Sequence, residues 1–80
     1  MITPAQCRAA RALLKWKQDE LARRASVGVA TVRTFEVGKS APHDSTLRLL
    51  KETFEKAGVE FIAKGEVPQH PAGPGVRLKG

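Results

Sequence analysis

Two short helical segments joined by three residues constrain the fold of this chain more than any other feature. They run over about 18–25 and 29–37, and Ser26-Val27-Gly28 interrupts the helical pattern between them. Helices joined by so short a turn cross steeply, so each must present small or apolar side chains to the other. Such side chains recur where that packing needs them, at Leu21, Ala22, Ala25, Val27, Val32 and Phe35. The pattern predicts a helix-turn-helix, whereas an ordinary αα-hairpin in a bundle would not explain the three-residue turn.

The outward face of the 29–37 helix indicates what the chain binds. It carries small, polar or basic residues, as a helix needs in order to enter the major groove and reach base edges. A solvated helix would more usually carry Glu and Lys there. Arg33 can pair with guanine through two hydrogen bonds, or it can contact a phosphate instead. Val29 and Ala30 can contact thymine methyl groups or simply leave room for the bases, and Thr34 completes this face.

Two further helices flank this pair. Thr3-Pro4 predicts the start of a helix that continues to about Lys15, because threonine caps helices and proline suits the first helical position. A fourth helix, capped by Asp44 or Ser45, is predicted up to Gly58, with apolar side chains at helical spacing. Gly38 is predicted to end the 29–37 helix.

After Gly58 the hydrophobic period changes to that of strands. Residues 59–63 and 76–79 predict a pair of short strands, joined by a glycine- and proline-rich loop over 64–75. The expected fold is therefore mainly α: a four-helix helix-turn-helix domain over 1–58, followed by a short hairpin-like β extension over 59–80.

The charge distribution favours a polyanionic partner. The chain has 14 Lys and Arg against 8 Asp and Glu, a net charge of +6. Residues 1–40 contain eight basic and three acidic residues (8 − 3 = +5), and residues 41–80 contain six and five (6 − 5 = +1). A basic half of this kind is expected of a nucleic-acid-binding protein, although a basic soluble surface is the plainer interpretation.

Other function classes find little support. One cysteine and two histidines cannot build a zinc site, and no catalytic set or glycine-rich phosphate loop is present. We therefore expect no enzyme activity, no metal and no cofactor. Cys7 is interpreted as a buried small hydrophobe rather than a redox sensor, and Trp16 as half-buried packing rather than a stacking platform for bases. No signal peptide or membrane-spanning segment is recognised, so a cytoplasmic location is expected.

The chain resembles the phage-repressor/Cro-like helix-turn-helix regulators, the XRE family. The resemblance covers about residues 3–57, on Arg11, the run 18–25, Val27, the run 32–39 and Pro42. Residues 58–62 and 75–78 are similar to a bacterial subgroup of very short members that append two strands to the helical core.

The resemblance implies roles for individual residues. Lys17 and Gln18 would lie near a phosphate, and Thr31 close to the DNA backbone. Arg11 and Glu36 match a structural pair that ties the first helix to the end of the reading helix. The DNA-binding set that we expect is Lys17, Gln18, Gly28, Val29, Ala30, Thr31, Arg33, Thr34, Lys39, Ser40 and His43.

The turn departs from the family pattern at two positions. Ser26 stands where a glycine often adopts the left-handed conformation, at a cost of roughly 1 kcal/mol. Gly28 replaces a side-chain cap with a weaker one, which costs a few tenths of a kcal/mol, and removes a hydroxyl that relatives offer to a phosphate. The fold should survive both changes.

We expect the chain to act as a homodimer, because one short helix reads only a few base pairs and two copies multiply the discrimination. The strands are the surplus element available for self-association. The expected interface residues are Val59, Phe61, Ile62, Val76 and Leu78. The alternative hypothesis is a protein-binding module, an antiactivator or antitoxin-like partner that reuses the same fold.

Overall fold

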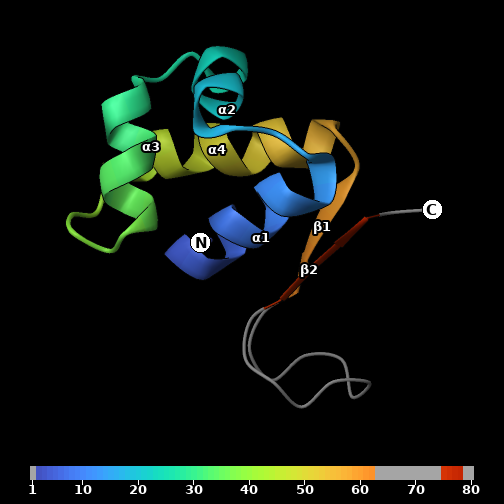
Figure 1. The fold of residues 1–80 in the computed structure, drawn as a ribbon. Helices are drawn as coiled ribbons and strands as arrows, with labels where there is room; N and C mark the ends of the chain where they lie inside the picture. Colours follow the sequence, from blue (N-terminus) through green and yellow to red (C-terminus); the bar gives the residue numbers. More distant parts are fainter. Residues whose placement is uncertain (1, 63–74, 79–80) are drawn as a thin grey trace.

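The computed structural model describes residues 2–62 and 75–78. Its elements are α1 (Pro4–Leu14), α2 (Gln18–Ala25), α3 (Val29–Glu36), α4 (Asp44–Lys56), β1 (Val59–Ile62) and β2 (Gly75–Leu78) (Figure 1). The predicted fold class, four helices followed by a two-stranded antiparallel sheet, is confirmed. Gly75 is the first residue of β2, whereas the predicted loop included it. The rest of that loop, His70 and the strand-end positions 63 and 79 lie outside the described residues.

Helix α1 begins as its sequence predicts. The Thr3 hydroxyl accepts a hydrogen bond from the Gln6 main-chain N–H at 3.1 Å, and the Gln6 side chain accepts one from the Thr3 N–H at 2.9 Å. This reciprocal capping box satisfies two N–H groups that would otherwise lack partners. The helix ends at Leu14, one residue earlier than predicted, because Lys15 adopts the left-handed conformation with φ of 58°.

The turn between α2 and α3 has the predicted geometry. Ser26 is left-handed with φ of 59°, and the Val27 N–H donates to the Ala22 carbonyl at 3.0 Å. Gly28 caps α3 through its backbone, with no side-chain hydrogen bond. Helix α3 ends at Glu36 rather than at the predicted Val37, which is its C-cap. Gly38 follows with φ of 77°, a conformation that glycine adopts without strain.

The predicted cap of α4 is wrong by one residue. His43, not Asp44 or Ser45, is the N-cap, because its backbone is extended and its carbonyl accepts from the Thr46 and Leu47 N–H groups at 3.0 Å each. Asp44 therefore lies inside the first turn, where its negative charge is favourable for the helix dipole.

The hydrophobic core lies where α2, α3 and α4 meet α1 and the sheet. Leu21, Val32 and Phe35 are buried, and Val27 packs against this core from the turn, so the predicted packing of the two helices is confirmed. Phe54 of α4 is fully buried at the centre. The remaining core side chains come from α1, α2, α4, β1 and the segment before α1: Ile2, Cys7, Ala10, Ala22, Ala25, Leu47, Leu50 and Val59.

The two strands pack on the helices. They run antiparallel, with Val59 opposite Leu78 and Phe61 opposite Val76. Val59 is fully buried, and the Gln6 side-chain amide of α1 donates to the Ile62 carbonyl at 3.2 Å. In the described residues the sheet is thus joined to the helical core by both packing and hydrogen bonding.

Candidate nucleic-acid interface

Helix α3 lies at the edge of the molecule, with one side on the core and the other side open (Figure 1). Val32, Phe35 and Glu36 are buried and fix the rotation of the helix about its axis. Ala30 and Arg33 are exposed as a consequence. The expected reading face is therefore on the surface at these two positions.

The other members of the reading face are partly buried. Val29 packs against the core, so only part of its side chain is open to a ligand. Thr31 and Thr34 are half-buried. The Thr34 hydroxyl donates to the Ala30 carbonyl at 3.0 Å and lies 3.3 Å from the Thr31 carbonyl. Its proton is thus used within the helix, which leaves its oxygen lone pairs and methyl group for an external partner.

Arg33 differs from most arginines of the chain. It makes no hydrogen bond or ion pair with any residue that the structure describes, whereas Arg23 and Arg24 both contact the Glu20 carboxylate. Arg24 also lies over the Trp16 ring, 4.6 Å from its centroid. These two cations are therefore held on α2, and the guanidinium of Arg33 is the one that α3 presents to a partner.

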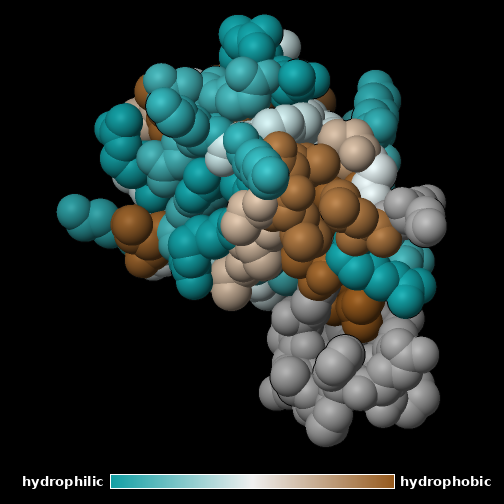
Figure 2. Space-filling view, turned by 45° about the vertical axis from the view of Figure 1, so that its right-hand side comes forward, coloured by the Kyte–Doolittle hydropathy of each residue, from teal (hydrophilic) through white to brown (hydrophobic). Residues whose placement is uncertain are grey.

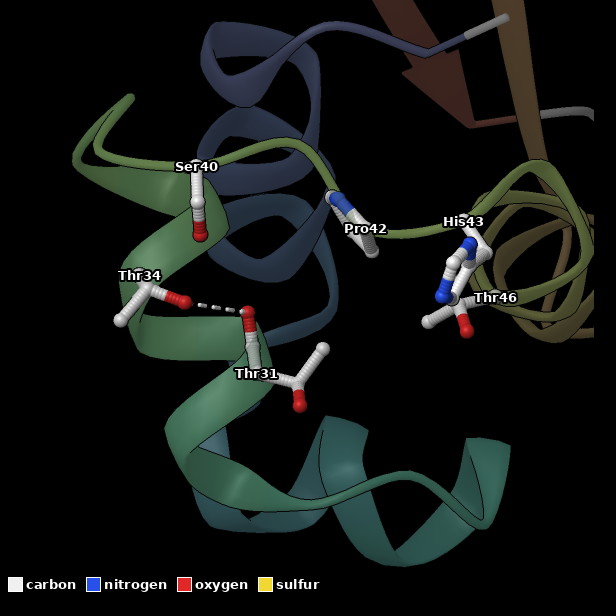
Figure 3. Close-up of a pocket in the computed structure, with 6 residues that line it drawn as sticks. All are labelled: Thr31, Thr34, Ser40, Pro42, His43 and Thr46. Atoms are coloured by element: carbon white, nitrogen blue, oxygen red, sulfur yellow. Dashed lines mark hydrogen bonds between the residues drawn. The ribbon is translucent and has the colours of Figure 1, made fainter.

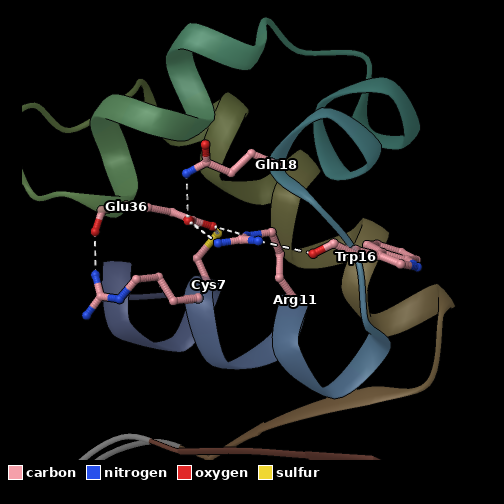
Figure 4. A network of polar contacts seen from close by, with 6 residues as sticks. Cys7, Arg11, Trp16, Gln18 and Glu36 are labelled. Carbon is pink, nitrogen blue, oxygen red and sulfur yellow. Dashed lines mark hydrogen bonds and ion pairs between the residues drawn. The ribbon is translucent and has the colours of Figure 1, made fainter.

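A buried carboxylate holds the end of α3 in place (Figure 4). Arg11 of α1 donates twice to Glu36, from Nε at 2.7 Å and from Nη2 at 2.8 Å. Gln18 of α2 donates from Nε2 to the same carboxylate at 3.0 Å, and the Cys7 thiol donates at 3.1 Å. We call Cys7, Arg11, Gln18 and Glu36 the Glu36 network. It connects three helices, and the structural role expected for Arg11 and Glu36 is confirmed.

Two further contacts support the Glu36 network. Arg8 donates to the main-chain carbonyl of Glu36, near the end of α3, and Arg11 donates to the Trp16 carbonyl at 3.1 Å. The sequence reasoning missed Arg8, which has no signal beyond its place one residue after the buried Cys7. Gln18, expected near a phosphate, is oriented by its hydrogen bond to Glu36.

The network shifts the protonation equilibria of its members. Burial by itself raises the pKa of Glu36, but hydrogen bonds from Arg11, Gln18 and Cys7 outweigh it, so the pKa is lowered. Burial, with the hydrogen bond to Glu36, strongly raises the pKa of the Cys7 thiol. The thiol therefore stays protonated, and the interpretation of Cys7 as a buried residue is confirmed.

The remaining expected DNA-binding residues surround α3. Lys17 is exposed as the N-cap of α2, Gly28 is exposed at the start of α3, and Lys39 is exposed in the loop that follows it. Ser40 and His43 line an open pocket between α3 and the start of α4 (Figure 3). The other residues lining this pocket are Thr31, Thr34, Pro42 and Thr46.

Pro42 and Thr46 were not in the expected set. Their place in the pocket depends on how the loop after α3 brings the start of α4 back beside α3. No local pattern in the sequence reports that arrangement. The pocket joins Thr31 and Thr34 of α3 to Ser40 of the loop and His43 at the start of α4, so these expected binding residues lie together.

The expected dimer residues differ in how far they are exposed. Val59 is fully buried in its own protomer, and Phe61 packs edge-on against Phe54 with ring centroids 5.9 Å apart. Ile62 and Val76 are half-buried, and Leu78 is 49% exposed. Leu78 is thus the apolar strand residue most available to a partner. Trp16, interpreted as packing, stacks on Phe54 with centroids 5.8 Å apart, which confirms that interpretation.

No group of three or more His, Cys, Asp or Glu side chains among residues 2–62 and 75–78 is placed to hold a metal ion. In the same part of the chain, none of the helices has the length and apolar character needed to cross a membrane.

Comparison with known protein families identifies the family of the chain. The family model described as "Helix-turn-helix" matches residues 8–61, which is more than half of the chain and includes all four helices from Arg8 onward as well as most of β1. No curated protein sequence matches the chain significantly. The match extends past Gly58 into the first strand, in agreement with the packing of Val59 in the core.

Proposed function

Because the chain belongs to the helix-turn-helix family, in its XRE/Cro-like branch, we propose that it is a sequence-specific regulator of transcription that binds double-stranded DNA as a homodimer. Helix α3 enters the major groove with Ala30 and Arg33 toward the base edges. The observation that carries this proposal is the guanidinium of Arg33, which is exposed and makes no ion pair with any residue that the structure describes, on a helix whose opposite side is anchored in the core. Such a helix presents a donor pair in a fixed direction, as recognition of guanine requires.

Phosphate contacts surround this reading face in the proposal. Lys17, Lys39 and Ser40 are exposed on the segments next to α3 and supply positive charge or hydrogen-bond donors. Phosphate contacts position a protein on the duplex, whereas base contacts discriminate between sequences. The remaining members of the proposed set are Gln18, Gly28, Val29, Thr31, Thr34 and His43.

Binding to DNA is expected to weaken steeply as salt concentration rises. Each neutralised phosphate releases condensed counterions, so the logarithm of the association constant should fall linearly with the logarithm of the salt concentration, with a slope of about −0.9 per phosphate contact. Selection of bound sites from random duplex DNA, followed by a salt titration on the selected duplex, measures both specificity and this slope. A flat salt dependence would contradict the proposed mechanism.

The alternative is a protein-sequestering module. Such a module would present large apolar or acidic side chains on the open side of α3. In that helix and its C-cap, Val37 is the one large hydrophobic residue that is strongly exposed, at 69%. Failure to recover any preferred duplex in the selection would favour this alternative.

Dimerisation through the strands is the second part of the proposal. Figure 2 shows apolar side chains gathered on the side of the molecule where the strands lie, with polar side chains over much of the helical surface in that view. In the dimer we propose that Leu78 and Ile62 contact the second copy, while Phe61 and Val76, which pack against the core of their own protomer, support the strands from inside. Val59 supports the strand from inside its own protomer.

Replacing Leu78 with glutamate is expected to shift the protein from dimer to monomer, because the change puts a charge into an apolar contact. Analytical ultracentrifugation over a range of concentrations measures the shift. Leu49→Glu is the matched control, since Leu49 on α4 is exposed to a similar extent, 44% against 49%. A dimer constant changed equally by both variants, or by neither, would contradict the assignment to the strands. A truncation at Gly58 is a poorer test, because it removes Val59 from the core.

A further inference from the structure

Trp16 and Arg24 form a stacked pair on the surface, at the side of the core. The buried Phe54 stacks on the Trp16 ring from the inside, with ring centroids 5.8 Å apart. The Arg24 guanidinium, whose side chain is 49% exposed, lies over the ring from the solvent, 4.6 Å from its centroid. The ring is therefore covered from both sides, and it is the edge of the indole that remains open to a ligand.

Two open hollows flank this pair, and Trp16 and Arg24 line both of them. The first hollow lies between the end of α1 and α2, and its other lining residues are Lys15, Lys17, Asp19 and Glu20. The second lies between α2 and the end of α4, and its other lining residues are Thr53, Lys56 and Ala57. Since they share their central residues, the hollows are adjacent. They are referred to below as the Trp16 hollows.

The Trp16 hollows favour an anion. The described residues that line them include four basic side chains, Lys15, Lys17, Arg24 and Lys56, against the two acidic side chains of Asp19 and Glu20. The Glu20 carboxylate is already held by Arg23 at 2.6 Å and by Arg24 at 2.5 Å. Among the described residues that line the second hollow, none is acidic. A negatively charged group is thus attracted most strongly to that hollow.

Hydrogen-bond donors are also available there. The Trp16 indole N–H makes no hydrogen bond with any described residue, and Figure 4 shows the ring nitrogen directed away from the Glu36 network. Arg24 uses its Nε for Glu20, so the donors of both Nη atoms remain. The Thr53 hydroxyl donates to the Leu49 carbonyl at 2.7 Å and is therefore not a free donor. Indole, guanidinium and the ammonium of Lys56 donate only, which suits a carboxylate because its oxygens only accept.

The Trp16 hollows lie apart from the reading helix. The pocket beside α3 is lined by Thr46, near the start of α4, whereas the second hollow is lined by Lys56, the last residue of that helix. A helix rises 1.5 Å per residue, so these two positions are about 15 Å apart along α4. A ligand in the hollows is therefore outside the surface that α3 presents.

We propose that the Trp16 hollows bind an acidic segment of a protein partner. One carboxylate lies between Arg24 and Lys56 at the indole N–H, and a second lies beside Lys15 and Lys17. In an extended chain, side chains two residues apart point the same way, so glutamates at such a spacing enter the two adjacent hollows together. This binding goes beyond the proposed function and does not depend on it.

The covered ring decides against a nucleic-acid base as the ligand. Proteins that hold single-stranded nucleic acids stack the bases on open aromatic faces. Phe54 and Arg24 occupy the faces of Trp16, so this residue offers an N–H donor and no stacking platform. A phosphate backbone remains the competing polyanion, and the test includes it.

The test uses a signal from the site itself, because Trp16 is the only tryptophan of the chain. A hexaglutamate peptide with blocked ends is titrated into the full chain at low ionic strength, and hexaglutamine is the neutral control. Tryptophan fluorescence and the NMR signal of the indole N–H follow binding. We expect both signals to change saturably with hexaglutamate and to stay constant with hexaglutamine. Equal responses to the two peptides, or no saturable response, would overturn the proposal.

Arg24→Gln and Arg23→Gln form a matched pair. Both arginines contact Glu20 from α2 and each variant removes one positive charge, but Arg23 is not among the residues that line the hollows. Arg24→Gln should weaken the association with hexaglutamate about two- to fivefold, as expected for the loss of an exposed ion pair. Lys56→Gln should weaken it similarly, and Arg23→Gln should leave it unchanged. Equal losses in Arg23→Gln and Arg24→Gln would reduce the attraction to net charge and overturn the site.

A duplex of random sequence separates the acidic segment from the phosphate backbone. We expect Arg24→Gln to weaken the response of the Trp16 signals to hexaglutamate and to leave any response to the duplex unchanged. A response to the duplex that Arg24→Gln abolishes would overturn the proposal in favour of a phosphate site. The peptide titration does not involve α3, so a positive result supports the site even if the proposed function fails.

Discussion

Replacing Glu36 with alanine is expected to lower the free energy of unfolding by about 3–5 kcal/mol, because it removes the acceptor of a largely buried ion pair and leaves its partners unsatisfied. Glu36 is 1% exposed and accepts from Arg11, Gln18 and Cys7. A small domain has a total stability of similar size, about 0.05–0.15 kcal/mol per residue. Chemical denaturation followed by circular dichroism measures the loss.

Two further variants serve as controls for the loss of stability in Glu36→Ala. Glu20→Ala also removes a carboxylate that two arginines contact, but on α2, where the side chain is 29% exposed, so it should change stability far less. Glu36→Gln keeps the size of the side chain and removes its charge, so it remains measurable if the alanine variant does not fold. Similar losses for Glu20→Ala and Glu36→Ala would contradict the importance given to burial.

Acid should affect the same site with a definite sign. The pKa of Glu36 is lower in the folded protein than the ordinary value of 4.5. Its contribution to stability is therefore fully present above about pH 4.5 and is lost as the pH falls through the lower folded value. The difference in stability between the unmodified protein and Glu36→Gln should shrink in that acid range. A difference that stays constant would place the stabilising charge elsewhere.

The second large effect is expected at Arg33. Arg33→Ala should weaken binding to a selected duplex by about 1–3 kcal/mol for each protomer, the value of one bidentate contact to guanine. It should relax the sequence preference at one position in each half-site. A repeat of the selection with the variant, together with affinity measurements on single-base variants of the duplex, tests both expectations.

Arg48→Ala is the matched control for Arg33→Ala. Arg48 is an exposed arginine on α4 that, like Arg33, has no ion pair with a described residue, so the variant removes the same charge from another helix. It should leave the base preference unchanged. A uniform loss of affinity across all sequences in Arg33→Ala would make Arg33 a phosphate contact.

The sequence predicted the helices well because their signals are local. The apolar spacing from Leu21 to Phe35 fixes two helices and the faces by which they meet, and Thr3-Pro4 marks the start of α1. The sequence offered two caps for α4, since Asp44 and Ser45 both have side chains suited to capping. In the structure the His43 carbonyl begins the helix instead, by accepting from the Thr46 and Leu47 N–H groups.

The features that could not be predicted from the sequence are side-chain contacts between different helices. Cys7 was expected in the core, but its hydrogen bond to Glu36 requires α1 to lie against the end of α3. Arg8 reaches the Glu36 carbonyl through the same arrangement. The pocket beside His43 likewise forms because α4 starts next to α3. Residues that belong to no recognised sequence motif, such as Thr46, line it for that reason.

The Glu36 network and the exposed face lie on different sides of the same two-turn helix. Glu36 and Phe35 face inward, while Ala30 and Arg33 face outward. Substitutions on the outward side therefore leave the anchor of the helix intact, so under the proposed function the base preference can change without loss of the fold. For protein engineering, positions 30 and 33 of α3 can be randomised together in a library while the inward half of the helix is kept constant.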